Sequence, residues 1–196
     1  MLINISFLNN IEKCFIFKNK TKRSFNDLVL KDMPLNDLVN YTSIIQTDDS
    51  EQYFIKISRS KHGKRSLWRF IFRDIISERL LFTVRSLVEY RGSKTLDKIG
   101  IKTPKVYAAG FFLTNMKSYT GIIIYKKMEN LISAQEILLT STSIEKKKTL
   151  LENIRLDYKK MAKHKLHFKD LHMSNILVNP KTNDIYWVDV GLSRIF

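Results

Sequence analysis

The sequence predicts an α+β fold of two lobes, with strands dominating the first part and helices the second. Short runs of β-forming apolar residues extend to Ile57 and recur over 105–112 and 121–127. Helix-type apolar spacing covers 86–98 and 145–163, with a helical region beginning at Ala134. A pair of short β runs around a turn lies near the C-terminus. We therefore expect a first lobe over about 1–127 and a partial second lobe over about 128–196.

Composition favours a single compact domain. The chain has 196 residues with 44% hydrophobic content, which is enough for a core. One cysteine, Cys14, excludes a disulfide framework and fits a reducing compartment. Neither a membrane-spanning apolar stretch nor a signal-peptide pattern is expected, so cytoplasmic residence is predicted.

A β-hairpin near the C-terminus is the local structure on which the functional prediction depends. Residues 176–178 form one apolar β run, 179–184 have turn chemistry, and 185–188 form a second β run. Such a hairpin would bring Asp189, at its end, beside Asn175, at its start. Gly191 is expected to permit a tight turn after Asp189.

Asp170, Asn175 and Asp189 have the order and spacing of a phosphotransferase site. Asp170 precedes Asn175 by five residues, and Asp189 follows the hairpin. An aspartate that faces a hydroxyl nucleophile, with an asparagine and a second aspartate on Mg²⁺, is what transfer of a nucleotide γ-phosphate requires. Asp170 is therefore predicted to be the catalytic base, and Asn175 and Asp189 the metal ligands.

Two upstream residues complete this pattern. Lys56 is surrounded by apolar residues in a β-forming run, which suits a strand lysine that binds nucleotide phosphates. Glu89 lies on the predicted helix over 86–98 and is the candidate partner that holds the lysine in place.

These segments together resemble the lipopolysaccharide core kinases, the Kdo and heptose kinase family of the protein-kinase-like superfamily. The resemblance is carried by four segments: YFIKIS; EYRGSKTLDKIGIKTPKVYAAG; GIIIYKKMEN; and HFKDLHMSNILV with IYWVDVGLSR. It implies a protein-kinase-like fold, ATP and Mg²⁺ as cofactors, and the roles already given to the five residues. It also implies an insertion between Lys56 and Glu89, predicted as a basic helical segment over 59–85.

The chain departs from the protein-kinase pattern in several places. Phe168 replaces the histidine usually found two residues before the catalytic aspartate, so a hydrogen bond that steadies the metal-binding turn is lost, although phenylalanine can still pack there. His172 stands where serine/threonine protein kinases carry lysine, which argues against a protein substrate. No glycine precedes Gly63, so the segment 41–49 must cover the nucleotide with ordinary residues. The chain stops five residues after Gly191, so the second lobe is expected to be truncated.

The net charge of +15 indicates an anionic partner. Basic residues dominate from Lys56 to Lys105 and alternate with bulky apolar residues in an amphipathic pattern that would suit peripheral contact with a membrane surface. A solvated face of an ordinary lobe is the alternative. Nucleic acid is a less favoured partner, since no nucleic-acid-binding motif accompanies the charge.

The function predicted is an ATP- and Mg²⁺-dependent kinase that phosphorylates a sugar hydroxyl of the lipopolysaccharide inner core at the cytoplasmic membrane face. Two alternatives stay open. IKTPKVY and DVGLSRIF also resemble the compact atypical kinases associated with tRNA modification. A non-catalytic pseudokinase or anionic-surface binding module is the second alternative, favoured by Phe168, the glycine-free loop and the early end of the chain.

Overall fold

The computed structural model describes residues 2–7, 11–18, 27–30, 41–46, 52–59, 84–114 and 118–194. The predicted basic insertion over 59–85 lies outside these residues except near its ends, where Arg59 ends a strand and Arg85 begins a helix. The segment 41–49, expected to cover the nucleotide, is described only over Tyr41–Gln46, which form a strand.

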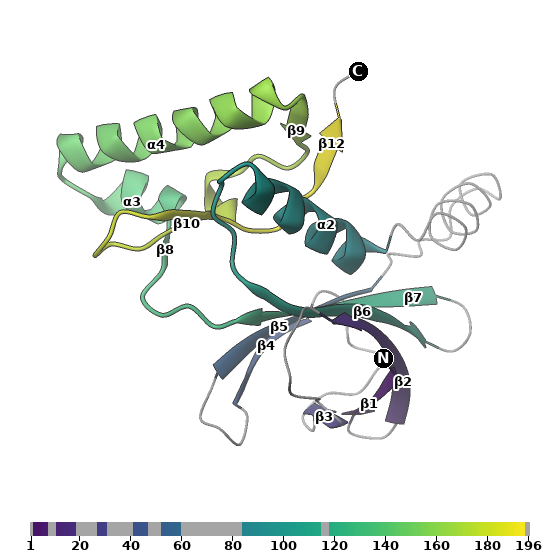
Figure 1. Ribbon diagram of the computed structural model, residues 1–196. Coiled ribbons are helices and arrows are strands. Elements are labelled where there is room, and N and C mark those ends of the chain that lie inside the picture. Colours follow the sequence, from purple (N-terminus) through teal and green to yellow (C-terminus); the bar gives the residue numbers. More distant parts are fainter. Residues whose placement is uncertain are drawn as a thin grey trace, which may run out of the picture. The chain divides into compact units, whose positions relative to one another are not determined.

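The chain divides into two compact units (Figure 1). The first comprises Met1–Val88 and Lys105–Lys127, and the second comprises Glu89–Pro104 and Met128–Phe196. The segment that begins at Glu89, predicted as part of the first lobe, therefore groups with the later residues. The description of the chain as one kinase-like domain stays a prediction.

The first unit is built on a seven-stranded sheet of order β3-β1-β2-β6-β7-β5-β4. Its strands are β1 (Leu2–Phe7), β2 (Ile11–Lys18), β3 (Asp27–Leu30), β4 (Tyr41–Gln46), β5 (Gln52–Arg59), β6 (Val106–Thr114) and β7 (Ser118–Lys126). All neighbours pair antiparallel except β1 and β3, which pair parallel. Ile55 and Ile57 of β5 are completely buried, which explains why this run of apolar residues forms an interior strand.

Helix α2 (Arg85–Lys98) begins against this sheet. Its first turn belongs to the first unit, where the Ser86 hydroxyl donates a 2.7 Å hydrogen bond to the carbonyl of Gly110 in β6. A side chain at Gly121 of β7 would place its Cβ 2.6 Å from Ser86 Oγ. The absence of that side chain lets the helix start close to the strand.

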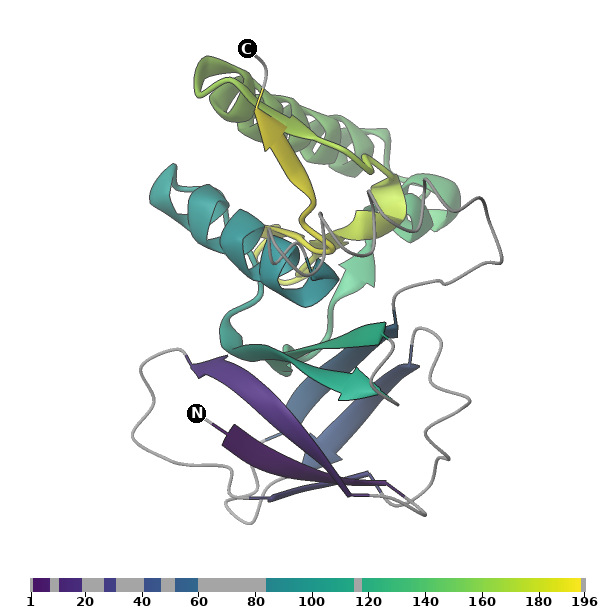
Figure 2. The same cartoon turned by 90° about the vertical axis from the view of Figure 1, so that its right-hand side faces the viewer.

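The second unit combines the rest of α2 with short strands and two further helices. They are β8 (Ile132–Ser133), α3 (Ala134–Thr140), α4 (Ile144–Lys163), β9 (Leu166–Phe168), the 3₁₀ turn η3 (Met173–Asn175), β10 (Ile176–Val178), β11 (Ile185–Trp187) and β12 (Leu192–Arg194). One core joins them, with Leu96 from α2, Met161 from α4 and Trp187 from β11 all fully buried in it. The segment that contains β12 runs between α2 and α4 (Figure 2).

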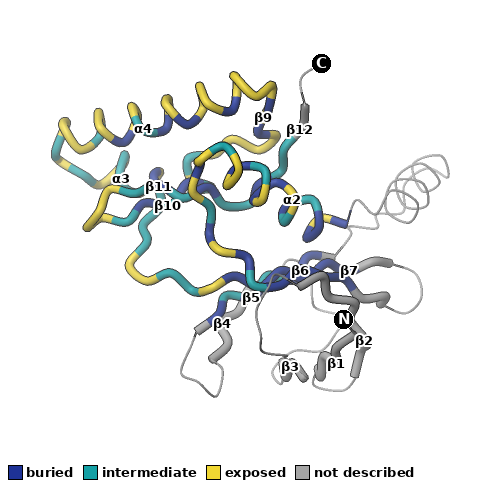
Figure 3. Tube along the Cα trace, viewed as in Figure 1, coloured by how far each residue is buried: buried dark blue, intermediate teal, exposed yellow. Residues whose placement is uncertain are grey.

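Helix α4 covers this core with one face only (Figure 3). Leu150, Ile154, Asp157 and Met161 are its buried residues, and their spacing of three and four places them on one side. The helix predicted over 145–163 is confirmed within one residue at its start. The side chain of Ser143 caps the helix by accepting a hydrogen bond from the backbone N–H of Lys146 at 3.3 Å, so helix begins at Ile144.

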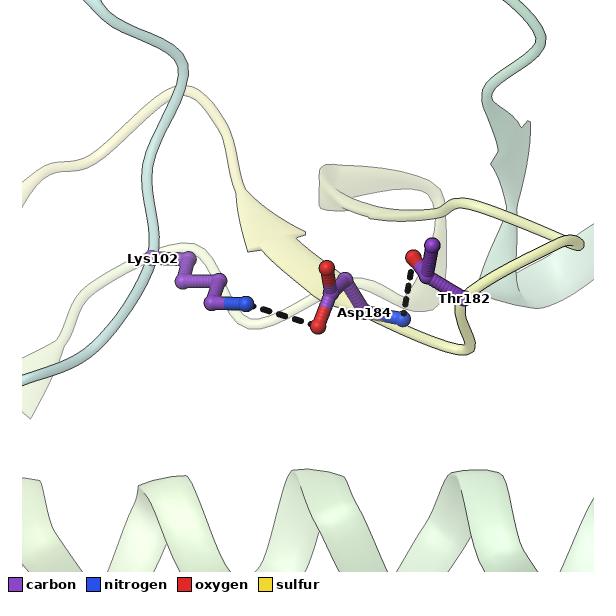
Figure 4. Close-up of polar contacts among 3 residues, drawn as sticks. All are labelled: Lys102, Thr182 and Asp184. Atoms are coloured by element: carbon purple, nitrogen blue, oxygen red, sulfur yellow. Dashed lines mark hydrogen bonds and ion pairs between the residues drawn. The ribbon is translucent and has the colours of Figure 1, made fainter.

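The turn between β10 and β11 is held by local and distant contacts. Within the turn, the backbone N–H of Asn179 donates to the Asp184 carbonyl at 2.9 Å, and Asn183 adopts a left-handed φ of 57°. Lys102, just after α2, forms a 2.7 Å ion pair with the Asp184 carboxylate (Figure 4). The hydrogen bond from Lys102 lowers the pKa of Asp184, and the same bond raises the pKa of Lys102. The ion pair therefore ties the hairpin turn to the segment that follows α2.

In the described part of the chain, no helix is long and apolar enough to cross a membrane.

Replacing Asp184 with asparagine is expected to lower the free energy of unfolding by only about 0.5 kcal/mol at neutral pH, since exposed ion pairs contribute little. The Lys102 and Asp184 side chains are 56% and 35% exposed. Because the pKa of Asp184 is lowered in the folded state, its contribution is present above the pKa of an unfolded aspartate, about 3.9, and is lost as the pH falls through the lowered value. Urea unfolding of parent and variant across this acid range should show the difference shrinking.

Asn179→Ala is the matched control. The side-chain Oδ1 of Asn179 accepts a 3.0 Å hydrogen bond from the backbone N–H of Lys181 in the same turn, and this bond has no ionisable partner. The loss of this bond should lower the free energy of unfolding by the same amount at every pH, and a pH-independent effect of Asp184→Asn would contradict the role given to the ion pair.

Candidate active site

Asp170 lies in a compact turn between β9 and β10. Its backbone carbonyl accepts a 3.0 Å hydrogen bond from the N–H of His172, and the His172 carbonyl in turn accepts a 2.9 Å bond from the N–H of Asn175. These two successive bonds fold the segment between Asp170 and Asn175 back on itself. The Asp170 side chain is 56% exposed, so its carboxylate is accessible to a substrate hydroxyl.

The side chain of Asn175 is hydrogen-bonded to the backbone of Asp170, the residue predicted to be the catalytic base. Its side-chain Nδ2 donates a 3.0 Å hydrogen bond to the backbone carbonyl of Asp170. Because the amide nitrogen is engaged in this bond, the amide oxygen points the other way and is the atom that a cation would use. The bond also fixes the amide relative to the loop that carries Asp170.

Asp189 is brought to Asn175 by the predicted hairpin. Strands β10 and β11 pair antiparallel with Ile176 opposite Trp187, and the backbone N–H of Val188 donates a 2.9 Å hydrogen bond to the Asn175 carbonyl. The antiparallel pairing thus extends one residue beyond the strands. Asp189 directly follows Val188, whose backbone is hydrogen-bonded to Asn175. The prediction that the hairpin returns the chain to Asn175 is confirmed by this backbone pairing.

The turn after Asp189 is built differently from the prediction. Asp189 itself adopts the left-handed conformation, with φ 55°, whereas Gly191 does not. The N–H of Gly191 donates to the Asp189 carbonyl at 2.9 Å, and the Gly191 carbonyl accepts a 2.9 Å bond from the N–H of Lys169. Aspartate tolerates this conformation better than most residues, and the last bond joins the Asp189 turn to the residue before Asp170.

The other two candidates lie on a strand and on a helix. Lys56 is half-buried in β5, an interior strand, where it stands opposite Thr42 of β4 and Ile123 of β7. Glu89 is buried on α2, with 4% of its surface exposed, which is unusual for a carboxylate. Lys56 belongs to the first unit and Glu89 to the second, so their pairing stays a prediction.

The donor set suits a hard divalent cation. An amide oxygen from Asn175 and a carboxylate from Asp189 are oxygen ligands, which Mg²⁺ prefers, and Mg²⁺ commonly takes few protein ligands and completes its shell with phosphate oxygens and water. Among the described residues, no group of three or more histidine, cysteine, aspartate or glutamate side chains could hold a metal. The two oxygen donors, Asn175 and Asp189, fit an ion whose remaining ligands come from a nucleotide and water.

The family model of the lipopolysaccharide kinase (Kdo/WaaP) family matches residues 41–191, about three quarters of the chain. The chain belongs to this family. The matched range includes all five predicted site residues. A comparison with curated proteins finds no match.

The solved structure of WaaP has a fold similar to that of this chain. The WaaP structure determined in complex with acyl carrier protein superimposes with a TM-score of 0.51 at 14% identity, covering 80% of this chain and 59% of that one. Vaccinia related kinase 3 gives a TM-score of 0.39 at 12% identity, covering 78% and 51%, and the MAP kinase LmaMPK10 from Leishmania major gives 0.42 at 16%, covering 79% and 44%. The chain thus spans about half of the length of the structures it matches, and it has an α+β fold.

In this Kdo/WaaP family chain, Phe168, which the sequence predicts to replace the usual kinase histidine, belongs to an aromatic pair. Phe168 is 1% exposed and packs on the fully buried ring of Trp187, with ring centroids 5.3 Å apart and planes inclined by 52°. Phe168 lies two residues before Asp170, and Trp187 lies two residues before Asp189. Packing between the two rings therefore joins the strands that lead into both predicted acids.

Trp187 is held in turn by the buried carboxylate of Asp157, which was not among the residues predicted from the sequence. Its indole N–H donates a 3.0 Å hydrogen bond to Oδ2 of Asp157, whose Oδ1 pairs with Lys160 at 3.0 Å. Asp157 is 7% exposed on the inner face of α4. The sequence feature that could have identified Asp157 is its position among the regularly spaced apolar residues of a helix. An acidic residue at such a position is expected to be buried with a hydrogen-bond partner.

His172 contacts the side chain of Asp170. Its Nε2 lies 2.9 Å from Asp170 Oδ1, and the two side chains are 70% and 56% exposed. The sequence did not predict this contact between His172 and Asp170. The interaction orients the carboxylate without withdrawing it from solvent.

Replacing Trp187 with phenylalanine is expected to lower the free energy of unfolding by about 2–4 kcal/mol, because it removes the donor to a buried carboxylate and leaves space in the core. A double-mutant cycle with Asp157→Leu isolates the bond. We expect a coupling energy of about 1 kcal/mol or more in urea unfolding.

Tyr186→Phe is the control for this cycle, because Tyr186 is the half-buried neighbour of Trp187 in β11. It should not couple to Asp157. Strictly additive effects of Trp187→Phe and Asp157→Leu would show that the indole bond contributes nothing specific.

Proposed function

We propose that the chain is an ATP- and Mg²⁺-dependent kinase that phosphorylates a sugar hydroxyl of the lipopolysaccharide inner core. The observation that carries the proposal is the junction of the Asp170 loop, Asn175 and the Asp189 turn through the Asn175 side-chain bond and the Val188 backbone bond. Membership of the Kdo/WaaP family supports the acceptor class.

In the reaction proposed, the acceptor oxygen forms a bond to the γ-phosphorus while the bond from that phosphorus to the β,γ-bridging oxygen breaks, releasing ADP. The carboxylate of Asp170 orients the hydroxyl and takes its proton. Asn175 and Asp189 would hold Mg²⁺, which would supply positive charge to the phosphate oxygens. Lys56 binds the α/β-phosphates, and Glu89 holds that lysine in place.

The proposed place of action is the inner face of the cytoplasmic membrane. The acceptor is an anionic glycolipid, and the chain carries a net charge of +15 that is concentrated between Lys56 and Lys105. Basic and bulky apolar residues in that stretch would meet lipid phosphates and the bilayer interface by peripheral contact.

The direct test is phosphate transfer from labelled ATP to dephosphorylated core lipopolysaccharide in vesicles. Asp170→Asn should lower the rate by a factor on the order of 10²–10⁴, the usual contribution of a positioned base, while nucleotide binding persists. Glu152→Gln, an exposed change on α4, is the control and should leave the rate unchanged.

The outcome also separates the alternatives. Equal transfer by parent and Asp170→Asn would contradict the role of Asp170. Transfer to a tRNA-modification complex but not to lipopolysaccharide would favour the compact atypical kinases, and nucleotide binding without any transfer would favour a pseudokinase.

The two metal ligands can be tested without an acceptor. Asn175→Ala and Asp189→Ala should each abolish the additional thermal stabilisation that Mg²⁺ gives in the presence of a non-hydrolysable ATP analogue, because each removes an oxygen ligand. Differential scanning fluorimetry with and without Mg²⁺ measures this increment. An unchanged increment in both variants would place the ion elsewhere.

A further inference from the structure

Helix α2 meets the turn that carries Asp189 at a residue without a side chain. Gly92 is buried, and a Cβ added to it would lie 2.8 Å from Cγ1 of Val190 and closer still to the Val190 carbonyl oxygen. The nearest obstacle is backbone, which cannot rotate away as a side chain can. Any residue larger than glycine would therefore push the helix and the turn apart.

Both sides of this contact belong to the second unit, and both are buried. Val190 is 1% exposed and forms part of the core that also includes Leu96 of α2. Gly92 lies inside the helix, where glycine is a poor residue for helix formation. Its presence there is consistent with a requirement for close approach rather than for helix stability.

Each side of the contact is close in sequence to a residue of the proposed site. Val190 directly follows Asp189. Glu89 precedes Gly92 by three residues and therefore lies on the same face of α2. The separation between the helix backbone at Gly92 and the Val190 carbonyl thus sets how near Glu89 comes to the metal-binding turn.

We propose that Gly92 is a positioning residue of the phosphotransfer reaction, which acts through Val190 to hold the Asp189 turn against the helix that carries Glu89. This inference rests on the proposed function. Gly92 contacts no substrate or reacting atom. Its contribution is the absence of a side chain, which lets the turn keep the left-handed conformation of Asp189 under a close-packed helix.

The chain supplies a matched control in Gly100, which ends the same segment. Gly100 has φ 74°, and no atom lies within 4 Å of the position that its Cβ would take. Gly100→Ala strains the backbone locally but does not press on the Asp189 turn. Gly92→Ala favours helix formation but creates the contact with Val190. The two variants therefore separate general destabilisation from displacement of the turn.

The first measurement is hydrogen exchange of residues 186–192, followed by mass spectrometry on parent and variants. We expect Gly92→Ala to raise exchange in this segment by about tenfold, since the bonds from Val188 to Asn175 and from Gly191 to Asp189 are the ones displaced. Gly100→Ala should leave exchange there at the parent level. Val190→Ala, which removes Cγ1 without adding an atom, should change exchange in the same direction as Gly92→Ala.

The second measurement is the affinity for Mn²⁺ with a non-hydrolysable ATP analogue, determined by electron paramagnetic resonance. Displacement of a residue that orients a metal ligand typically lowers metal affinity 10–100-fold, so we expect a loss of about tenfold in Gly92→Ala and none in Gly100→Ala. The turnover rate should fall with the affinity in Gly92→Ala.

The inference would be overturned if Gly92→Ala had the same exchange over 186–192 and the same Mn²⁺ affinity as the parent. It would also be overturned if Gly92→Ala had a higher melting temperature than the parent, because alanine stabilises a helix that is not pressed against Val190. A parent that binds no nucleotide or transfers no phosphate overturns the proposed function instead, and the exchange measurement still decides whether Gly92 holds the turn.

Discussion

The antiparallel pairing of β10 with β11 is the interaction on which the rest of the candidate site depends. It brings together two residues that are 14 positions apart in the chain, Asn175 and Asp189, through a backbone bond from Val188. Side chains alternate along a strand, so a shift of register by one residue would turn Trp187 out of the core. The burial of Trp187 and Phe168 makes that shift unfavourable, and the register is therefore specified by the core as well as by the turn.

The Phe168–Trp187 pair shows how the site is steadied without the usual histidine. The two rings pack together two residues before Asp170 and two residues before Asp189, and the carboxylate of Asp157 orients the indole from α4. A buried carboxylate is costly unless its oxygens are satisfied, and both are satisfied here by Trp187 and Lys160. Helix α4 thus contributes a polar contact as well as apolar cover. Because packing steadies this region, the absence of the histidine is a weaker argument for a pseudokinase than it was when only the sequence was considered.

Much of the architecture could be predicted from the sequence, because it depends on local periodicity and turn chemistry. The helix predicted over 86–98 is found at Arg85–Lys98, and the hairpin has strands at Ile176–Val178 and Ile185–Trp187. The features that could not be predicted arise from contacts between distant segments. The bond between Asp157 and Trp187, the close approach of Gly92 to Val190, and the grouping of 89–104 with the later unit each require three-dimensional packing that no local pattern encodes. The left-handed conformation belongs to Asp189 and not to Gly191 for the same reason, since the surrounding bonds determine it.

The central claim is that Asn175 and Asp189 share one metal ion. A crystal structure with Mn²⁺ and a non-hydrolysable ATP analogue, with the ion located by its anomalous scattering, tests it most directly. The account predicts an anomalous peak about 2.0–2.3 Å from both the Asn175 amide oxygen and an Asp189 carboxylate oxygen, with phosphate oxygens completing the shell. A peak bound to neither residue, or two separate peaks that each use only one of them, would contradict it.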